Sequence, residues 1–218
     1  MIRPIIGVNF NSYTKQIPAK AAIASNSPSF KGVYEAFKAV SDEHKAKTGY
    51  AIPMPMFPRG NAEDAIKSAI KGGYIKNEFD TLDVLDFGCG EGGTTEVAKS
   101  TFYNADVKGI DNQDYYKFDR QYFIEGDGIK YLNSGEKKFD LVAACMLSPD
   151  VEVEALIEAL PKGMRANGKF LAYSDPYTLG ELEKCLNSHK VRYHELCTED
   201  KGFKVIIVDK SELDARLN

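Results

Sequence analysis

Short apolar segments alternate with polar, helix-like segments from residue 81 to residue 209. The apolar segments have the length and composition of strands, and the segments between them repeat apolar residues at helical spacing. We predict strands at Leu82–Phe87, Val107–Ile110, Gln121–Glu125, Phe139–Cys145, Lys169–Tyr173, Val191–Cys197 and Phe203–Asp209. We predict helices at Thr94–Phe102, Val151–Leu160 and Thr178–Ser188, with a short helical turn at Ile129–Asn133.

Strands that alternate with helices favour a parallel sheet covered by helices on both faces. The last two predicted strands are an exception, because only Thr198–Gly202 separates them and this segment is too short for a crossover helix. They are therefore expected to form an antiparallel hairpin. The pattern predicts an α/β fold with a seven-stranded, mostly parallel sheet that is closed by a C-terminal antiparallel hairpin.

Residues 1–80 have a different texture and are predicted to form a helical and irregular N-terminal cap on a domain of residues 81–218. Apolar residues recur at helical spacing in Phe30–Lys47, which predicts a helix that ends at Gly49. Three prolines between residues 53 and 58 exclude a helix or a central strand there. A second helix is predicted at Ala62–Lys71, with Asn61 as its N-cap and a glycine pair after it.

Composition limits the classes of protein that fit. The longest strongly apolar run, Leu141–Leu147, is too short to span a bilayer, which needs about 20 residues in a helix. None of the four cysteines forms a C-x-x-C pair, so no metal site is expected, and free thiols suit a soluble protein of the reducing cytoplasm. The net charge of -4 argues against broad binding to nucleic acid, although residues 1–80 hold more basic than acidic side chains.

A glycine-rich turn joins the first predicted strand of residues 81–218 to its helix. The sequence there reads Asp86-Phe87-Gly88-Cys89-Gly90-Glu91-Gly92-Gly93. Glycines allow positive φ and let a ligand approach the backbone, and in open α/β sheets ligands bind at the carboxyl ends of the strands. The spacing Gly88-x-Gly90-x-x-Gly93 also fits the dinucleotide fingerprint, so the turn alone leaves two ligand classes open.

The segment Asp86-x-Gly88-x-Gly90-x-Gly92 resembles the first motif of the class I (Rossmann-like) methyltransferases, which use S-adenosylmethionine (SAM). Two later segments resemble further motifs of that family: Gly126-Asp127-Gly128 after the third strand and Lys138–Val142 in the fourth. Leu160–Leu171 resembles its loop into the fifth strand. Asp111 places an acid at the end of the second strand, where it can accept ribose hydroxyls, and this fits both SAM and NAD. A carboxylate such as Asp86 opposes a diphosphate but suits the cationic sulfur and ammonium of SAM, so we favour SAM over NAD.

The resemblance implies a role for each matching residue. Asp86 would help to position the amino group of SAM, Asp111 would accept the ribose hydroxyls, and Asn112 would flank the adenine. Asp127 and Gly128 would hold the adenine edge. The remaining implied SAM contacts are the turn residues Gly88, Cys89, Gly90 and Gly92, and the backbone of Cys145 and Met146.

In-line methyl transfer needs alignment more than a dedicated base, so no catalytic residue is singled out. The acceptor is expected beyond the fourth and fifth strands, where the substrate-side candidates are Tyr13, Arg59, Ser148 and Asp175. Signatures for base-nitrogen, cytosine-C5 and magnesium-dependent catechol methylation are missing, which favours a small-molecule acceptor. The alternatives are an RNA or protein methyltransferase, a non-catalytic SAM-binding subunit and an NAD-linked oxidoreductase.

Overall fold

The computed structural model describes residues 43, 46, 59–114, 118–147, 151–174, 176–197 and 204–217. The chain divides into two compact units, Met1–Pro53 and Met54–Asn218. All strands among the described residues belong to the second unit. Within the predicted helix Phe30–Lys47, the two described residues, Glu43 and Ala46, are helical. A role of residues 1–80 as a cap stays a prediction.

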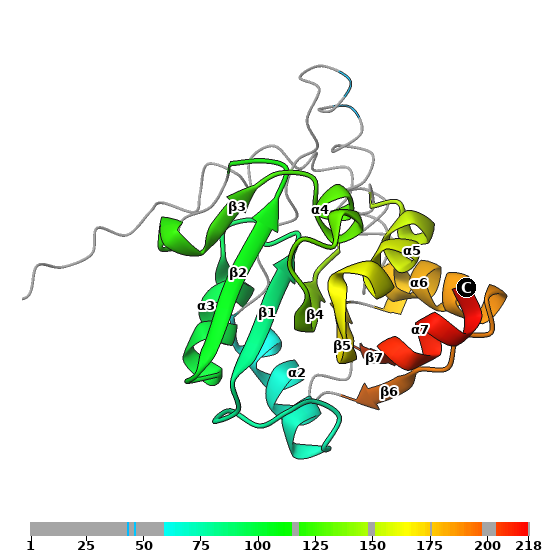
Figure 1. The fold of residues 1–218 in the computed structure, drawn as a ribbon, viewed down its shortest axis with the longest axis horizontal. Coiled ribbons are helices and arrows are strands. Elements are labelled where there is room, and N and C mark those ends of the chain that lie inside the picture. Colours follow the sequence, from blue (N-terminus) through cyan, green and yellow to red (C-terminus); the bar gives the residue numbers. More distant parts are fainter. Residues whose placement is uncertain are drawn as a thin grey trace, which may run out of the picture. The chain divides into compact units, whose positions relative to one another are not determined.

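One seven-stranded sheet forms the centre of the second unit (Figure 1). Its order is β3-β2-β1-β4-β5-β7-β6, and only β7 runs against the other strands. The strands are β1 (Leu82–Phe87), β2 (Ala105–Asp111), β3 (Phe123–Glu125), β4 (Phe139–Cys145), β5 (Met164–Ser174), β6 (His194–Cys197) and β7 (Lys204–Asp209). The predicted fold class and the C-terminal antiparallel hairpin are confirmed.

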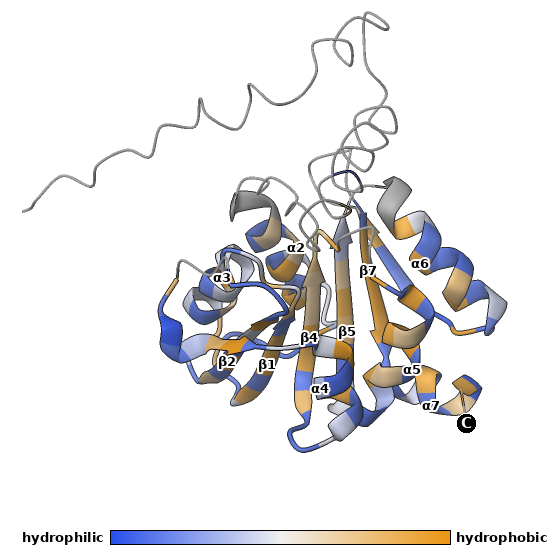
Figure 2. Cartoon of the chain, turned by 90° about the horizontal axis from the view of Figure 1, so that it is seen from above, coloured by the Kyte–Doolittle hydropathy of each residue, from blue (hydrophilic) through white to orange (hydrophobic). Residues whose placement is uncertain are grey.

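Both faces of the sheet are buried, because successive side chains of a strand point to opposite faces. In β7, Val205 and Ile207 pack in one apolar cluster, whereas Ile206 and Val208 pack in the other. This is why the central strands read as continuous apolar runs, which Figure 2 shows in orange.

Helices cover the two faces unequally. On one face, α2 (Arg59–Lys71) and α3 (Gly93–Thr101) pack on the sheet. The other face carries α4 (Gly128–Ser134), α5 (Val153–Gly163), α6 (Pro176–Ser188) and α7 (Lys210–Leu217). A 3-10 turn, η4 (Arg120–Tyr122), precedes β3. No helix among the described residues is long and apolar enough to cross a membrane.

Several predicted boundaries are wrong. Helix α2 begins at Arg59, so Asn61 lies inside it and is not its N-cap. The segment predicted as a loop before the fifth strand holds the last turn of α5, which contains Pro161, and the start of β5 at Met164 follows directly. Helix α7 was not predicted, because it buries only Leu213 and has little apolar periodicity.

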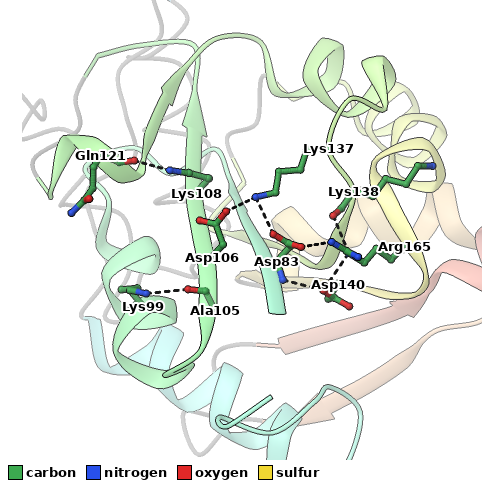
Figure 3. Close-up of polar contacts among 10 residues, drawn as sticks. All are labelled: Asp83, Lys99, Ala105, Asp106, Lys108, Gln121, Lys137, Lys138, Asp140 and Arg165. Atoms are coloured by element: carbon green, nitrogen blue, oxygen red, sulfur yellow. Dashed lines mark hydrogen bonds and ion pairs between the residues drawn. The ribbon is translucent and has the colours of Figure 1, made fainter. Parts of the chain in front are cut away.

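An ion-pair network joins the amino ends of the central strands (Figure 3). Lys137 Nζ lies 2.9 Å from Asp83 of β1 and 2.6 Å from Asp106 of β2. Arg165 of β5 pairs with Asp83, and its Nε lies 3.4 Å from Asp140 of β4. Four strands are thus tied together at the amino edge of the sheet, the edge opposite the glycine turn.

Candidate functional site at the carboxyl edge of the sheet

The glycine turn lies where the strand order reverses. Strand β1 has β2 on one side and β4 on the other, and the next helices, α3 and α5, cover opposite faces. Open α/β sheets bind ligands at such a switch point, beyond the carboxyl ends of the strands. The turn between β1 and α3 therefore lies where ligands bind in open α/β sheets.

Three glycines of the turn adopt left-handed backbone conformations, with φ of 70° at Gly88, 50° at Gly90 and 91° at Gly92. The N–H groups of Gly88 and Cys89 both donate to the carbonyl of Ile110, at 2.9 and 3.1 Å. A Cβ added at Gly88 or Gly90 would meet nothing within 4 Å. Glycine is thus needed at these two positions for the backbone conformation, and the space that a side chain would enter there is open.

Asp111, the last residue of β2, supports the turn. Its Oδ2 accepts a hydrogen bond of 2.9 Å from the Gly90 N–H, and its Oδ1 accepts one of 3.0 Å from the Gln113 N–H. Its carbonyl accepts from the Gly126 N–H at 2.9 Å. Each carboxylate oxygen has a second lone pair, so the side chain can still accept hydrogen bonds from the two hydroxyls of a diol while it holds the turn.

Asp86 is a buried carboxyl group below the turn, with only 1% of its surface exposed. Its Oδ2 accepts a 2.7 Å hydrogen bond from the hydroxyl of Thr95 in α3. Burial raises the pKa of Asp86 to about 7; the negative charge of Asp111 adds to this rise, and the hydrogen bonds of Thr95 oppose it. The group is therefore poised to gain or lose a proton near neutral pH.

Gly109 and Thr95 are parts of the site that the sequence analysis missed. A Cβ at Gly109, the neighbour of Asp86 in the β1–β2 register, would lie 2.6 Å from Thr95 Oγ1 and 2.9 Å from Cys89 Sγ. Glycine at this position lets α3 and the turn approach β2. A glycine inside a strand is itself a sign of close backbone approach, so the signal was present in the sequence.

The predicted Gly-Asp-Gly segment follows β3 and precedes α4. The side chain of Asp127 caps this helix, because its Oδ1 accepts from the N–H groups of Ile129 at 3.0 Å and Lys130 at 3.1 Å. A Cβ at Gly128 would lie 2.5 Å from the ring of Phe87 at the end of β1. The segment therefore lies beside the end of β1, and its adenine role stays a prediction.

Strand β4 brings Cys145 to the same place. The pKa of the Cys145 thiol is raised to about 12, first by burial and next by the charge of Asp86, while a hydrogen bond with Thr94 lowers it. Burial likewise raises the pKa of the Cys89 thiol. Both cysteines are neutral thiols at pH 7 and are unsuited to act as nucleophiles.

Met146, directly after β4, has a φ of 61°, which is rare for a residue with a long side chain. Its N–H donates to the carbonyl of Tyr173 at 2.8 Å, and its sulfur lies 3.8 Å from the Ser174 hydroxyl. The end of β5 therefore holds this backbone in place. Strained backbone of this kind is concentrated at functional sites, and the contact of Met146 with SAM stays a prediction.

Other predicted residues are placed less fully. Asn112 follows β2 and is exposed. Arg59 is the first residue of α2, and only its backbone belongs to the described part of the structure. Tyr13, Ser148 and Asp175 lie outside the described residues. The structure thus gathers Asp86, the turn, Asp111, the Asp127 segment and Cys145–Met146, whereas the acceptor side stays a prediction.

The acids of the site have no strong cationic partner within the described part of the chain. No described lysine or arginine forms an ion pair with Asp86 or Asp111. Asp127 has one, the highly exposed Lys130, at 3.4 Å. The partners of Asp86 and Asp111 are a hydroxyl and backbone N–H groups, so no described cation offsets negative charge at the turn, and this disfavours a diphosphate.

Comparison with known proteins gives a fold but no sequence match. No protein-family model and no curated protein sequence matches the chain. Solved methyltransferase structures do match. The plantazolicin methyltransferase BpumL, in complex with a triazolic desmethylPZN analogue and SAH, superposes with a TM-score of 0.57 at 16% identity over 81% of this chain and 94% of that one.

Two further structures have different acceptors. The 16S rRNA methyltransferase RsmC of T. thermophilus, in complex with AdoMet and guanosine, has a TM-score of 0.51 at 17% identity and covers 71% of this chain and 43% of its own. The precorrin-6y C5,15-methyltransferase of Geobacter metallireducens has a TM-score of 0.50 at 14% identity, over 69% and 86%.

The chain has the class I methyltransferase fold. This fold accounts for the seven strands, their order and the single reversed strand β7. The predicted resemblance is confirmed at the level of the fold.

Proposed function

We propose that this protein is a SAM-dependent methyltransferase that acts on a small-molecule acceptor by in-line methyl transfer. The observation that carries the proposal is the glycine turn itself. It is open above Gly88 and Gly90, and it is flanked by Asp86 and Asp111, which form no ion pair with any described lysine or arginine. Two of the structures with this fold contain SAM or its product SAH.

The residues present fit SAM better than a dinucleotide. A diphosphate placed over the turn would face the carboxylates of Asp86 and Asp111, and the resulting repulsion would oppose binding. SAM has no phosphate, and its amino group and sulfur are both positive. The donors and acceptors of the site therefore match a cationic sulfur nucleoside.

When bound, SAM supplies a methyl carbon that is activated for displacement by the positive charge on the sulfur. Asp111 would accept the ribose hydroxyls as charge-assisted hydrogen bonds. Asp86, buried below the turn, would offer negative charge toward the amino group when it is ionised, and Asp127 would lie toward the adenine. The backbone of Cys145 and Met146, held by Tyr173, would fix the wall beside the reacting centre.

The charge of the protein favours a small-molecule acceptor over RNA. A protein that binds RNA broadly carries a basic footprint, and its affinity falls steeply with salt. The net charge of this chain is -4. At the turn itself, Asp86 and Asp111 form no ion pair with a described lysine or arginine, and this disfavours binding of a phosphate backbone.

The proposal is tested by calorimetric titration of the protein with SAM, SAH and NADH. We expect SAM and SAH to bind with one-to-one stoichiometry and NADH to give no heat of binding. Binding of NADH but not of SAM would refute the assignment of SAM as the cofactor. Incubation with labelled SAM and a panel of small-molecule and RNA acceptors then separates the acceptor classes, and transfer to RNA alone would refute the small-molecule assignment.

A further inference from the structure

Three side chains of types that bind zinc lie together between α5 and the end of α6, away from the glycine turn. The thiol of Cys185 donates a hydrogen bond of 2.9 Å to Oε2 of Glu154. Nε2 of His189 contacts Oε1 of the same carboxylate. One ligand atom from each residue lies within 4.8 Å of the other two. The cluster thus offers sulfur, nitrogen and oxygen ligands to one point.

The chain holds these residues in a fixed arrangement. Cys185 and His189 are four residues apart, and the His189 N–H donates to the Cys185 carbonyl at 3.2 Å, so they lie on one side of the end of α6. Glu154 lies in the first turn of α5. Cys185 and His189 at the end of α6 thus approach the carboxylate of Glu154 on α5 from the neighbouring helix.

The distances suit an ion as small as zinc. Bonds from zinc to sulfur, nitrogen and oxygen ligands are about 2.0–2.3 Å, so two ligands of one ion stand at most about 4.4 Å apart. The three ligand atoms lie within 4.8 Å of one another, close to this limit. Glu158, one helical turn beyond Glu154, lines with His189 a surface cavity of about 380 Å³, which leaves room for a water or a fourth side chain.

We propose that Glu154, Cys185 and His189 form a zinc site that clamps α5 to α6. Thiolate and imidazole select zinc over magnesium or calcium, which prefer oxygen ligands. On binding, the proton of the Cys185 thiol passes to solvent and its hydrogen bond to Glu154 is replaced by bonds to the ion. The thiolate and the carboxylate together balance the double positive charge. The site is independent of the proposed methyltransferase activity.

The test uses the full-length protein after removal of metal with EDTA. We expect calorimetric titration with Zn²⁺ to show a single site and the unfolding temperature to rise with bound metal. Titration with Co²⁺ reports the ligands directly, because a bound thiolate gives a sulfur-to-cobalt charge-transfer absorption. We expect this absorption to disappear in Cys185→Ser and the Zn²⁺ affinity to fall by more than about 100-fold in Cys185→Ser and in His189→Ala.

His194→Ala is the matched control, because His194 lies on β6, outside the cluster. It should bind Zn²⁺ as the unaltered protein does. Far-ultraviolet circular dichroism establishes whether each variant is folded. If Cys185→Ser does not fold, Glu154→Gln, which alters an exposed ligand, takes its place in the titration. Absence of a single Zn²⁺ site, or a site of undiminished affinity in Cys185→Ser and His189→Ala, would overturn the proposal.

Discussion

The two edges of the sheet hold the same kind of acid in opposite surroundings. At the amino edge, Asp83, Asp106 and Asp140 each lie against a lysine or arginine. At the carboxyl edge, Asp86 and Asp111 have only N–H and hydroxyl partners within the described chain. The same strand, β1, carries Asp83 at one end and Asp86 near the other.

The surroundings shift the pKa of these two carboxyls in opposite directions. Partial burial would raise the pKa of Asp83, but hydrogen bonds and charge from Lys137 and Arg165 outweigh it, and the pKa is lowered. Burial without a cation raises the pKa of Asp86 to about 7. At one edge the acids pair with cations and are structural, whereas at the other edge the charge of Asp111 meets no described lysine or arginine and Asp86 gains or loses a proton near neutral pH. The edge of the sheet at which an acid lies thus predicts its role better than the residue type does.

The largest expected effect is the pH dependence that Asp86 gives to the ligand-free protein. Its folded pKa of about 7 exceeds the ordinary value of 3.8, so between these values the folded state holds a proton that the unfolded state has lost. Stability therefore falls as pH rises from about 4 to 8, by about 4 kcal/mol at most. Urea unfolding across this range should show the slope, and Asp86→Asn should remove it.

The matched control for that experiment is Glu136→Gln, which removes one negative charge from an exposed side chain. It should keep the slope of the unaltered protein. Equal slopes in Asp86→Asn and the unaltered protein would mean that Asp86 is charged in the fold at neutral pH, and the contrast between the two edges would fail.

Asp111→Ala sharpens the comparison on the ligand side. Loss of the charge-assisted hydrogen bonds to the ribose should weaken SAM binding by about 1.5–3 kcal/mol. The variant also leaves the Gly90 N–H without its 2.9 Å acceptor, which adds to the loss. Calorimetric titration with SAM measures the change, and an unaltered affinity in a folded variant would refute the ribose assignment.

Gly109→Ala tests the packing that holds the carboxyl edge together. The new Cβ would lie 2.6 Å from Thr95 Oγ1, so α3 and the turn must move, and we expect a loss of about 1–3 kcal/mol in the free energy of unfolding. Gly126→Ala is the matched control, because a Cβ there meets nothing within 4 Å. Urea unfolding compares the two, and equal stabilities would contradict the close approach.

The sequence was sufficient for the parts of this edge that depend on local pattern. Strands β1 and β4 begin and end where predicted, because their residues are buried on both faces and their apolar runs are bounded by polar turns. The positive φ angles at Gly88 and Gly90 follow equally from the glycine spacing. The roles of Asp86 and Asp111 followed from the resemblance to the methyltransferase motifs, in which these positions lie beside the turn.

Features that depend on distant segments were not predicted. Thr95 forms part of the site only because α3 lies against β2; a glycine inside a strand marks a close approach at Gly109, but the local sequence does not say which segment approaches it. Cys185 and Glu154 are 31 residues apart, so a search for C-x-x-C pairs gave no sign of a metal site. The ion pair of Asp83 with Arg165 spans 82 residues. Such contacts become visible only after the topology places their strands and helices together.

The smallest effect is expected at the amino edge. Lys137→Met removes the pairs with Asp83 and Asp106 while it keeps the apolar stem, and partly exposed pairs of this kind contribute about 0.5–1 kcal/mol. Because the folded pKa of Asp83 is lowered, this stability is present above pH 3.8 and is lost as pH falls below it. Urea unfolding of Lys137→Met should therefore differ from the unaltered protein at pH 7 and converge with it near pH 3. SAM affinity should not change, because the network lies at the other edge of the sheet. A loss of SAM binding comparable with that of Asp111→Ala would show that the two edges do not act separately.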